Sequence, residues 1–347
     1  MPARQLLFHV GTHKTGTTAI QAYMSQCRTE LAAQGILYPS LRPGLWKEKE
    51  AHHKVVQAVA RHSIIDRVRL RRYRRWLDAA QARARLTVLS AEPVYRHVIG
   101  DVTPGDLPSW FAAHRNYLDR LAAWLAGFEV RPVVYFRQPE VLAVSMYKEH
   151  VVRRLLRGRE RRFASFIEMT APYYEYSRHV AALRDAFGDV AVRDYAAASR
   201  VGLQADFAAL IGAADLPPPA QTAVRASPGN RATLWLADQP EGRSRRDYVR
   251  RILFALRAEP AGPFAEAAPT TLWPDRATFE RFLEQHRAAW DLPFLSVPAW
   301  PDVATTSWTP DDYRAAEEAF GAWEARNLDL LRQREARKLT FYEPDPA

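Results

Sequence analysis

The sequence has few of the features that mark secreted, membrane-spanning or zinc-binding proteins. It contains one cysteine, Cys27, which excludes an intrachain disulfide and fits a reducing compartment. No apolar run reaches about 18 residues, so we expect no membrane-spanning helix. The short stretch before the first apolar run leaves no room for a signal peptide. We therefore expect a cytoplasmic protein. Histidines and carboxylates never have the spacing of a zinc-binding helix, so we also expect no metal.

Positive charge exceeds negative charge: 49 lysines and arginines against 39 acidic residues give a net charge of +10. Arginines concentrate in two segments, 67–75 and 153–162. Such runs commonly form exposed helix faces, which is the interpretation we prefer. Attraction of anionic substrates stays open as an alternative, and so does peripheral contact with a membrane. No recognised motif accompanies the charge, so we expect no nucleic-acid partner.

The most informative stretch follows an apolar run of strand length at 6–10 and reads Gly11-Thr12-His13-Lys14-Thr15-Gly16-Thr17-Thr18. Its glycines permit a tight turn and a close backbone approach to a ligand. Helix-forming residues come next, and a helix N-terminus attracts anions through its N–H groups and dipole. The lysine adds a mobile cation, and the threonines add hydroxyl donors. This stretch therefore predicts a site for a phosphate or sulfate group.

The position of the lysine distinguishes between two kinds of anion loop. A nucleoside-triphosphate loop reads Gly, four residues, Gly, Lys, then Ser or Thr. Here Thr17 occupies the lysine position, and Lys14 lies inside the loop. This arrangement resembles the 5′-phosphosulfate loop of sulfotransferases, which use 3′-phosphoadenosine 5′-phosphosulfate (PAPS) as sulfuryl donor. The resemblance implies that the donor is held by Gly11, His13, Lys14, Thr15, Gly16, Thr17 and Thr18.

A second motif extends the resemblance. The strand expected at 130–136 ends at Arg137, and Ser145 follows eight residues later in the next helix. In sulfotransferases the matching arginine and serine hold the 3′-phosphate of the donor, and a guanidinium fork suits phosphate oxygens. Arg225, in a later basic loop, is a further candidate for the same phosphate. Ala19 stands where cytosolic members carry an aromatic residue, so adenine stacking must come from elsewhere.

Strand-like and helix-like segments alternate through the first two thirds of the chain, with strands expected at 6–10, 86–90, 130–136 and 190–195. This alternation predicts the α/β class, with a parallel β-sheet flanked by helices. The resemblance implies the sulfotransferase variant of the P-loop NTPase fold. We expect this core to span residues 1–216. Residues 217–347 are expected to form a mostly helical C-terminal extension that packs on the core.

Sulfuryl transfer places two demands on such a site. Negative charge develops on the leaving oxygen, which Lys14 is placed to stabilise. The acceptor hydroxyl must lose a proton, so a general base is needed. Glu92 is the first candidate, because it follows the strand at 86–90, where cytosolic sulfotransferases carry their catalytic histidine. His52 and His53 are the rival candidates.

The expected function is therefore transfer of a sulfuryl group from PAPS to a hydroxyl or amine, without a metal. The acceptor is a small molecule or a glycan, and the product of the donor is 3′-phosphoadenosine 5′-phosphate (PAP). A P-loop kinase that uses ATP and Mg²⁺ is one alternative, which Thr17 at the lysine position disfavours. A non-catalytic nucleotide-binding protein is another. The sequence predicts neither the acceptor nor the oligomeric state.

Overall fold

The computed structural model describes residues 4–103, 105–213, 215–218, 227–257, 262–266, 268–337 and 339. These residues form two compact units. The first unit comprises the described residues within Met1–Leu142, Thr170–Thr222 and His286–Ser296. The second comprises those within Ala143–Met169, Ala223–Gln285 and Val297–Ala347. This division differs from the boundary expected after residue 216, because a middle segment belongs to the second unit and a late segment to the first.

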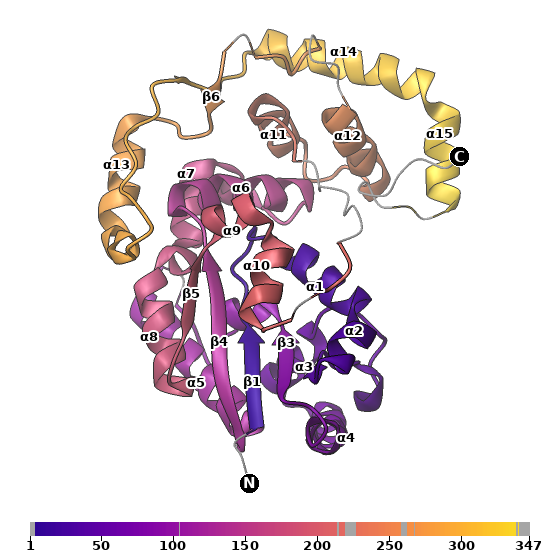
Figure 1. Cartoon of the computed structure of the whole chain (residues 1–347). Helices are drawn as coiled ribbons and strands as arrows, with labels where there is room; N and C mark the ends of the chain where they lie inside the picture. The colour runs from indigo at the N-terminus through magenta and orange to yellow at the C-terminus, as the bar shows by residue number, and fades with distance from the viewer. Residues whose placement is uncertain are drawn as a thin grey trace. The chain divides into compact units, whose positions relative to one another are not determined.

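A parallel sheet of five strands forms the centre of the first unit, in the order β2-β3-β1-β4-β5 (Figure 1). The strands are β1 (Arg4–His9), β2 (Ile36–Leu37), β3 (Leu86–Ser90), β4 (Phe128–Phe136) and β5 (Ala191–Asp194). In the register of the central strand, Leu6 lies opposite Thr87 on one side and Val130 on the other. Buried parallel strands read as apolar runs, which is why the sequence located them. The predicted parallel sheet is confirmed.

Helices flank this sheet, as the alternating pattern predicted (Figure 1). The α-helices of the first unit are α1 (Thr17–Gln26), α2 (Arg28–Ala33), α3 (His53–Arg61), α4 (Ile64–Gln81), α5 (Leu107–Leu125), α8 (Tyr176–Phe187), α9 (Tyr195–Val201) and α10 (Leu203–Leu210). Its 3-10 helices are η1 (Arg42–Gly44), η2 (Glu92–Arg96), η4 (Ala171–Tyr174) and η5 (Arg287–Asp291). The two helices after the loop bury apolar side chains: Ile20 and Met24 of α1 and Leu31 of α2 pack in one cluster with Val88 of β3 and Phe207 of α10.

The second unit is mainly helical. It contains most of α6 (Pro139–Val152), which begins in the first unit, and α7 (Phe163–Met169), α11 (Asn230–Ala237), α12 (Arg245–Arg257), α13 (Arg276–Gln285), α14 (Pro310–Arg326), α15 (Leu328–Ala336), η3 (Gly158–Arg161) and two short parallel strands, β6 (Thr270–Thr271) and β7 (Ala304–Thr305). Trp235 packs against Phe254 and Phe320 in its core. Across the described residues, no helix is both long and apolar enough to cross a membrane.

Candidate functional site

Four segments leave the sheet at the same edge, and three of them carry predicted site residues. The anion loop follows β1, Glu92 follows β3, Arg137 follows β4 and Tyr195 follows β5. Because all five strands are parallel, these segments lie at the carboxyl ends of their strands. Open parallel sheets bind their ligands at this edge. The topology therefore gathers the main motifs of the sequence into one candidate site.

The loop between β1 and α1 is tightly packed against its own surroundings. Gly16 has a left-handed backbone, with φ of 67°, and a Cβ added there would lie 2.2 Å from Leu203. A Cβ added at Gly11 would lie 2.1 Å from the Thr17 methyl group. Lys14 also has a positive φ, 61°, which is uncommon outside glycine. The sequence thus needs both glycines for the loop to fold as it does.

The N-terminus of α1 has backbone N–H groups available for an anion. No side chain caps it, so the first N–H groups of the helix are not bonded by a capping side chain. Two of the three predicted threonine donors are engaged elsewhere. Thr15 donates to the Thr12 carbonyl at 2.8 Å, and Thr17 donates to Glu92 at 2.9 Å. Thr18 is exposed at the start of the helix. The backbone and Thr18 are therefore the better placed donors.

Glu92 joins η2 to the anion loop. Its Oε2 accepts the hydrogen bond from Thr17, and its Oε1 lies 2.5 Å from Nδ1 of His13. Both side chains of the His13–Glu92 pair are largely buried. On the other side of the imidazole, an Nη atom of Arg96 lies 3.4 Å from Nε2. The structure therefore pairs a loop residue expected only to bind the donor with the expected base.

These contacts determine the protonation of Glu92. Burial by itself raises the pKa of Glu92, but the hydrogen bond and charge of His13 and the hydrogen bond from Thr17 lower it to about 2. A carboxylate with so low a pKa stays ionised near neutral pH and holds a proton weakly. Both of its oxygens also have partners in the protein. Glu92 is thus better suited to orient His13 than to accept a proton from a substrate directly.

His52 has a structural environment. Its side chain is buried, its Nδ1 accepts from the Ser90 N–H at 3.1 Å, and its Nε2 lies 3.0 Å from the Pro39 carbonyl. Burial lowers the pKa of His52 to about 4, although both backbone hydrogen bonds act in the opposite direction. With both ring nitrogens occupied by backbone groups, the ring has no atom left to take a proton from an acceptor. This geometry argues against His52 as the base.

His53 lies closer to the candidate site. Its Nε2 is 3.4 Å from Nε2 of Gln21, whose amide donates to Ser90 at 3.1 Å, and Ser90 in turn lies 2.9 Å from Nδ1 of His9. Burial lowers the pKa of His53, while the charge of Glu92 raises it. His53 is partly exposed, so it can still reach a substrate. It remains a rival for the role of base.

Arg137 has an aromatic setting at the end of β4. Its carbonyl accepts from the Tyr176 hydroxyl at 2.8 Å, and its guanidinium lies 5.6 Å from the centre of the Tyr195 ring. A Cβ added to Gly16 would lie 3.8 Å from the same tyrosine ring. Tyr195 therefore lies between the anion loop and Arg137. The sheet order, with β5 next to β4, brings Tyr195 to this position.

The other predicted phosphate ligands are less well defined. Ser145 is the seventh residue of α6, is partly exposed and belongs to the second unit. Arg225 lies outside the described residues. Sequence reasoning missed Glu140, in the first turn of α6, whose Oε2 is buried without a hydrogen-bond partner among the described residues. Burial raises the pKa of Glu140 to about 7, while Arg137 lowers it. A Glu directly after the Pro at a helix start was the signal that could have found it.

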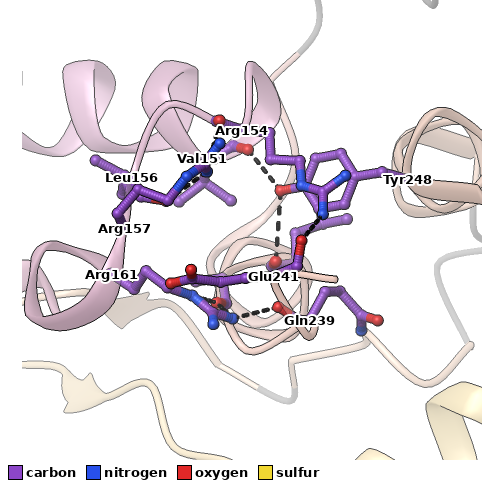
Figure 2. Close-up of a pocket in the computed structure, with 10 residues that line it drawn as sticks. Val151, Arg154, Leu156, Arg157, Arg161, Gln239, Glu241 and Tyr248 are labelled. Carbon is purple, nitrogen blue, oxygen red and sulfur yellow. Dashed lines mark hydrogen bonds between the residues drawn. The ribbon is translucent and has the colours of Figure 1, made fainter. Parts of the chain in front are cut away.

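The second unit contains a pocket of a different kind (Figure 2). Residues 151–161 and 236–248 line it, and three of the lining side chains are arginines: Arg154, Arg157 and Arg161. All three donate to backbone carbonyls. Arg154 donates to Glu241, Arg161 to Ala237 and Gln239, and Arg157 to two carbonyls of its own segment. This pocket contains none of the predicted site residues, and its arginines join two segments of the unit.

Comparison with known proteins gives a weak structural similarity. The chain matches no family model and no curated protein. A crystal structure of a sulfotransferase from Alicyclobacillus acidocaldarius aligns with 63% of this chain and 86% of its own, at 19% identity and a TM-score of 0.37. A similarity of this size carries no argument about function. The proposal below therefore rests on the residues of the site.

Proposed function

We propose that this protein is a sulfotransferase that moves a sulfuryl group from PAPS to a hydroxyl or amine of an acceptor. The observation that carries the proposal is the loop from β1 to α1. It combines an internal lysine, two sterically required glycines and a helix N-terminus that no side chain caps. Its lysine position differs from that of a nucleoside-triphosphate loop. The acceptor, a small molecule or a glycan, stays open.

The residues present fit such a donor. The uncapped N–H groups of α1 and the hydroxyl of Thr18 would hold the 5′ end, because helix N-termini favour anions. Arg137 is the candidate for the 3′-phosphate, with Ser145 and Arg225 as further candidates from the sequence. Tyr195 is the aromatic ring best placed to contact the nucleotide, in place of the ring missing at Ala19. Bound PAPS supplies the activated sulfuryl group.

We assign Lys14 to the leaving oxygen, since a preorganised cation acts most strongly where charge develops. For the base we assign the His13–Glu92 pair. In a neutral imidazole whose Nδ1–H donates to Glu92, Nε2 carries the lone pair. The acceptor hydroxyl would replace the exposed Arg96 guanidinium 3.4 Å from that atom and give Nε2 its proton. Glu92 then fixes the tautomer of the ring and balances the charge that the ring gains. This replaces the direct role for Glu92 that the sequence suggested.

A kinase is the second candidate function, because ATP-dependent kinases also bind phosphates at a strand–loop–helix motif. The two reactions differ in their need for metal. Sulfuryl transfer from PAPS should continue in the presence of a chelator, whereas phosphoryl transfer depends on Mg²⁺. An assay with both donors against a panel of hydroxyl and amine acceptors, with and without chelator, separates the candidates. Transfer from ATP alone would contradict the proposal.

The base assignment is tested by His13→Asn, Glu92→Gln and His53→Asn in that assay. Removing a general base typically lowers kcat by about 10²–10⁴. We expect this loss for His13→Asn and a smaller loss for Glu92→Gln. Full activity of His13→Asn with loss in His53→Asn would move the base to His53.

A further inference from the structure

One surface of the first unit exposes large aliphatic side chains beside arginines. Ile64, Ile65 and Val68, in the first turns of α4, are 73%, 64% and 57% exposed. Arg71, Arg72 and Arg75 follow on the same helix and are also exposed. We call these six residues the α4 outer face. Apolar residues exposed singly are ordinary, but three in two turns of one helix form a patch.

Helical geometry puts the six residues on one side. Ile64, Val68, Arg71 and Arg75 are separated by four, three and four residues, so they lie in one row along the helix. The opposite side of α4 is buried through residues such as Tyr73 and Leu77. Figure 1 shows α4 beside α3 at the edge of the sheet unit. The buried side of α4 therefore supplies its contacts with the core, and the side chains of the outer face stay exposed, with η1 contacting this face at Arg72.

The charge of this face has one sign. Arg71 and Arg75 form no ion pair with another described residue, and Arg72 donates only to the Pro43 carbonyl, at 2.9 Å. The one acidic residue between Ile64 and Arg75 is Asp66, which is buried and accepts hydrogen bonds from Ser63 and Arg61. The next carboxylate along the helix, Asp78, is paired with Arg74 and Arg4. Three exposed guanidiniums next to three aliphatic side chains thus face the solvent without an ion-pair partner in the segment from Ile64 to Arg75.

These features select one kind of partner. Nucleic acid would use the arginines but leaves the aliphatic side chains without a contact. A second copy of the chain would bring two arginine faces together, with like charges opposed. An anionic lipid surface satisfies both components, since phosphate groups attract the arginines and the interfacial region accepts the aliphatic side chains. We propose that the α4 outer face docks the protein on membranes that contain anionic phospholipid.

Co-sedimentation of the full chain with vesicles tests this docking. The vesicles contain either phosphatidylcholine alone or equal parts of phosphatidylcholine and phosphatidylglycerol. We expect binding to the mixed vesicles only, and release by salt. Arg71→Gln with Arg75→Gln should weaken binding about 30-fold, from roughly fivefold for each arginine. Ile64→Ser with Val68→Ser should weaken it by about tenfold or more, because less apolar surface enters the interface.

Matched controls change the same residue types elsewhere on the unit. Arg115→Gln with Arg184→Gln removes two exposed arginines from α5 and α8, and Val201→Ser removes an aliphatic side chain that is 69% exposed. These variants should bind as the wild type does. Thermal unfolding of every variant checks that it is folded, which is expected because all the changed residues are exposed.

Four results would overturn the proposal. The first is wild-type protein that stays in the supernatant with both kinds of vesicle, and the second is undiminished binding by both outer-face variants. In the third, only the arginine variant loses vesicle binding, and it loses binding to a single-stranded RNA probe to the same extent. That result would indicate a nucleic-acid partner. A concentration-dependent dimer in sedimentation velocity that Ile64→Ser with Val68→Ser abolishes would assign the face to a second copy. None of these measurements depends on sulfuryl transfer.

Discussion

The anion loop of the first unit and the arginine pocket of the second use polar groups in opposite ways. In the pocket, the guanidiniums of Arg154 and Arg161 donate to carbonyls of the facing segment. At the loop, the N-terminus of α1 has no side-chain cap. At the start of α6, which follows β4 and Arg137, the buried Oε2 of Glu140 has no hydrogen-bond partner among the described residues. Buried polar groups without partners cost stability. Polar groups without partners at this edge of the sheet are therefore consistent with a ligand that binds there.

This difference teaches how to interpret clustered arginines. The sequence shows two similar runs, 67–75 and 153–162, and favours solvated helix faces for both. The structure separates them. Arg154 and Arg161 of the second run line a pocket and donate to backbone carbonyls of the facing segment, whereas Arg71 and Arg75 of the first run face the solvent. Arg74 of the first run also donates to backbone carbonyls, so the difference lies in individual residues of each run. We therefore expect loop variants to lower catalysis without changing stability. We expect pocket variants to lower stability without changing ligand binding.

The largest effect is expected at Lys14. Lys14→Ala should lower kcat by about 10²–10³ with little change in PAP affinity, because the lysine acts on charge that grows only in the transition state. Steady-state kinetics and PAP titration measure the two quantities. Lys54→Ala, which removes an exposed lysine from α3, is the matched control. A normal kcat with a raised KM would show that Lys14 only binds the donor and does not stabilise the transition state, which would contradict a catalytic role for the loop.

The pocket should show the reverse behaviour. Arg161→Ala removes donors to Ala237 and Gln239, so we expect the free energy of unfolding to fall by about 2–3 kcal/mol. PAP affinity should stay as in the wild type. Urea denaturation measures the first quantity, and Arg159→Ala, in the same segment but exposed, serves as control. Loss of PAP binding in a folded Arg161→Ala protein would show that the pocket takes part in the ligand site.

A smaller, pH-dependent effect is expected at Glu140. Its pKa of about 7 lies above the ordinary value of 4.5, so the folded state favours the protonated acid. That stability is complete below about pH 4.5 and is lost as pH rises through 7. Glu140→Gln should therefore be more stable than the wild type at pH 8, by about 1–2 kcal/mol after allowance for partial exposure, and the advantage should vanish near pH 5. Thermal melts across this range measure it; a constant difference would contradict the assigned pKa.

Much of the fold could be predicted because burial leaves a periodic pattern. The strand expected at 86–90 has those bounds in the structure. Other ends were less accurate: the strand expected at 130–136 begins at Phe128, and the strand expected at 190–195 is Ala191–Asp194, because Asp194 caps a helix that begins at Tyr195. The division into units was not predicted, since it depends on contacts between segments far apart in the chain.

The site was only partly predictable for the same reason. The loop is a local pattern, so its residues could be named from the sequence. The pairing of His13 with Glu92 depends on β1 and β3 being neighbours in the sheet, which no local pattern states. Similarly, the two partners that occupy the ring of His52 come from Pro39 and Ser90. Sequence alone therefore offered three bases without the contacts that distinguish them.

The most direct test of the proposed function is the difference in affinity between PAP and 5′-AMP, which share the adenosine and the 5′-phosphate. Isothermal titration of the full chain should show PAP binding at least about tenfold more tightly, since one charged hydrogen-bonded contact is worth about 1.5–3 kcal/mol. Arg137→Ala should abolish most of this preference while leaving 5′-AMP affinity unchanged. Equal affinity for PAP and 5′-AMP, or tighter binding of ATP than of PAP, would contradict the account.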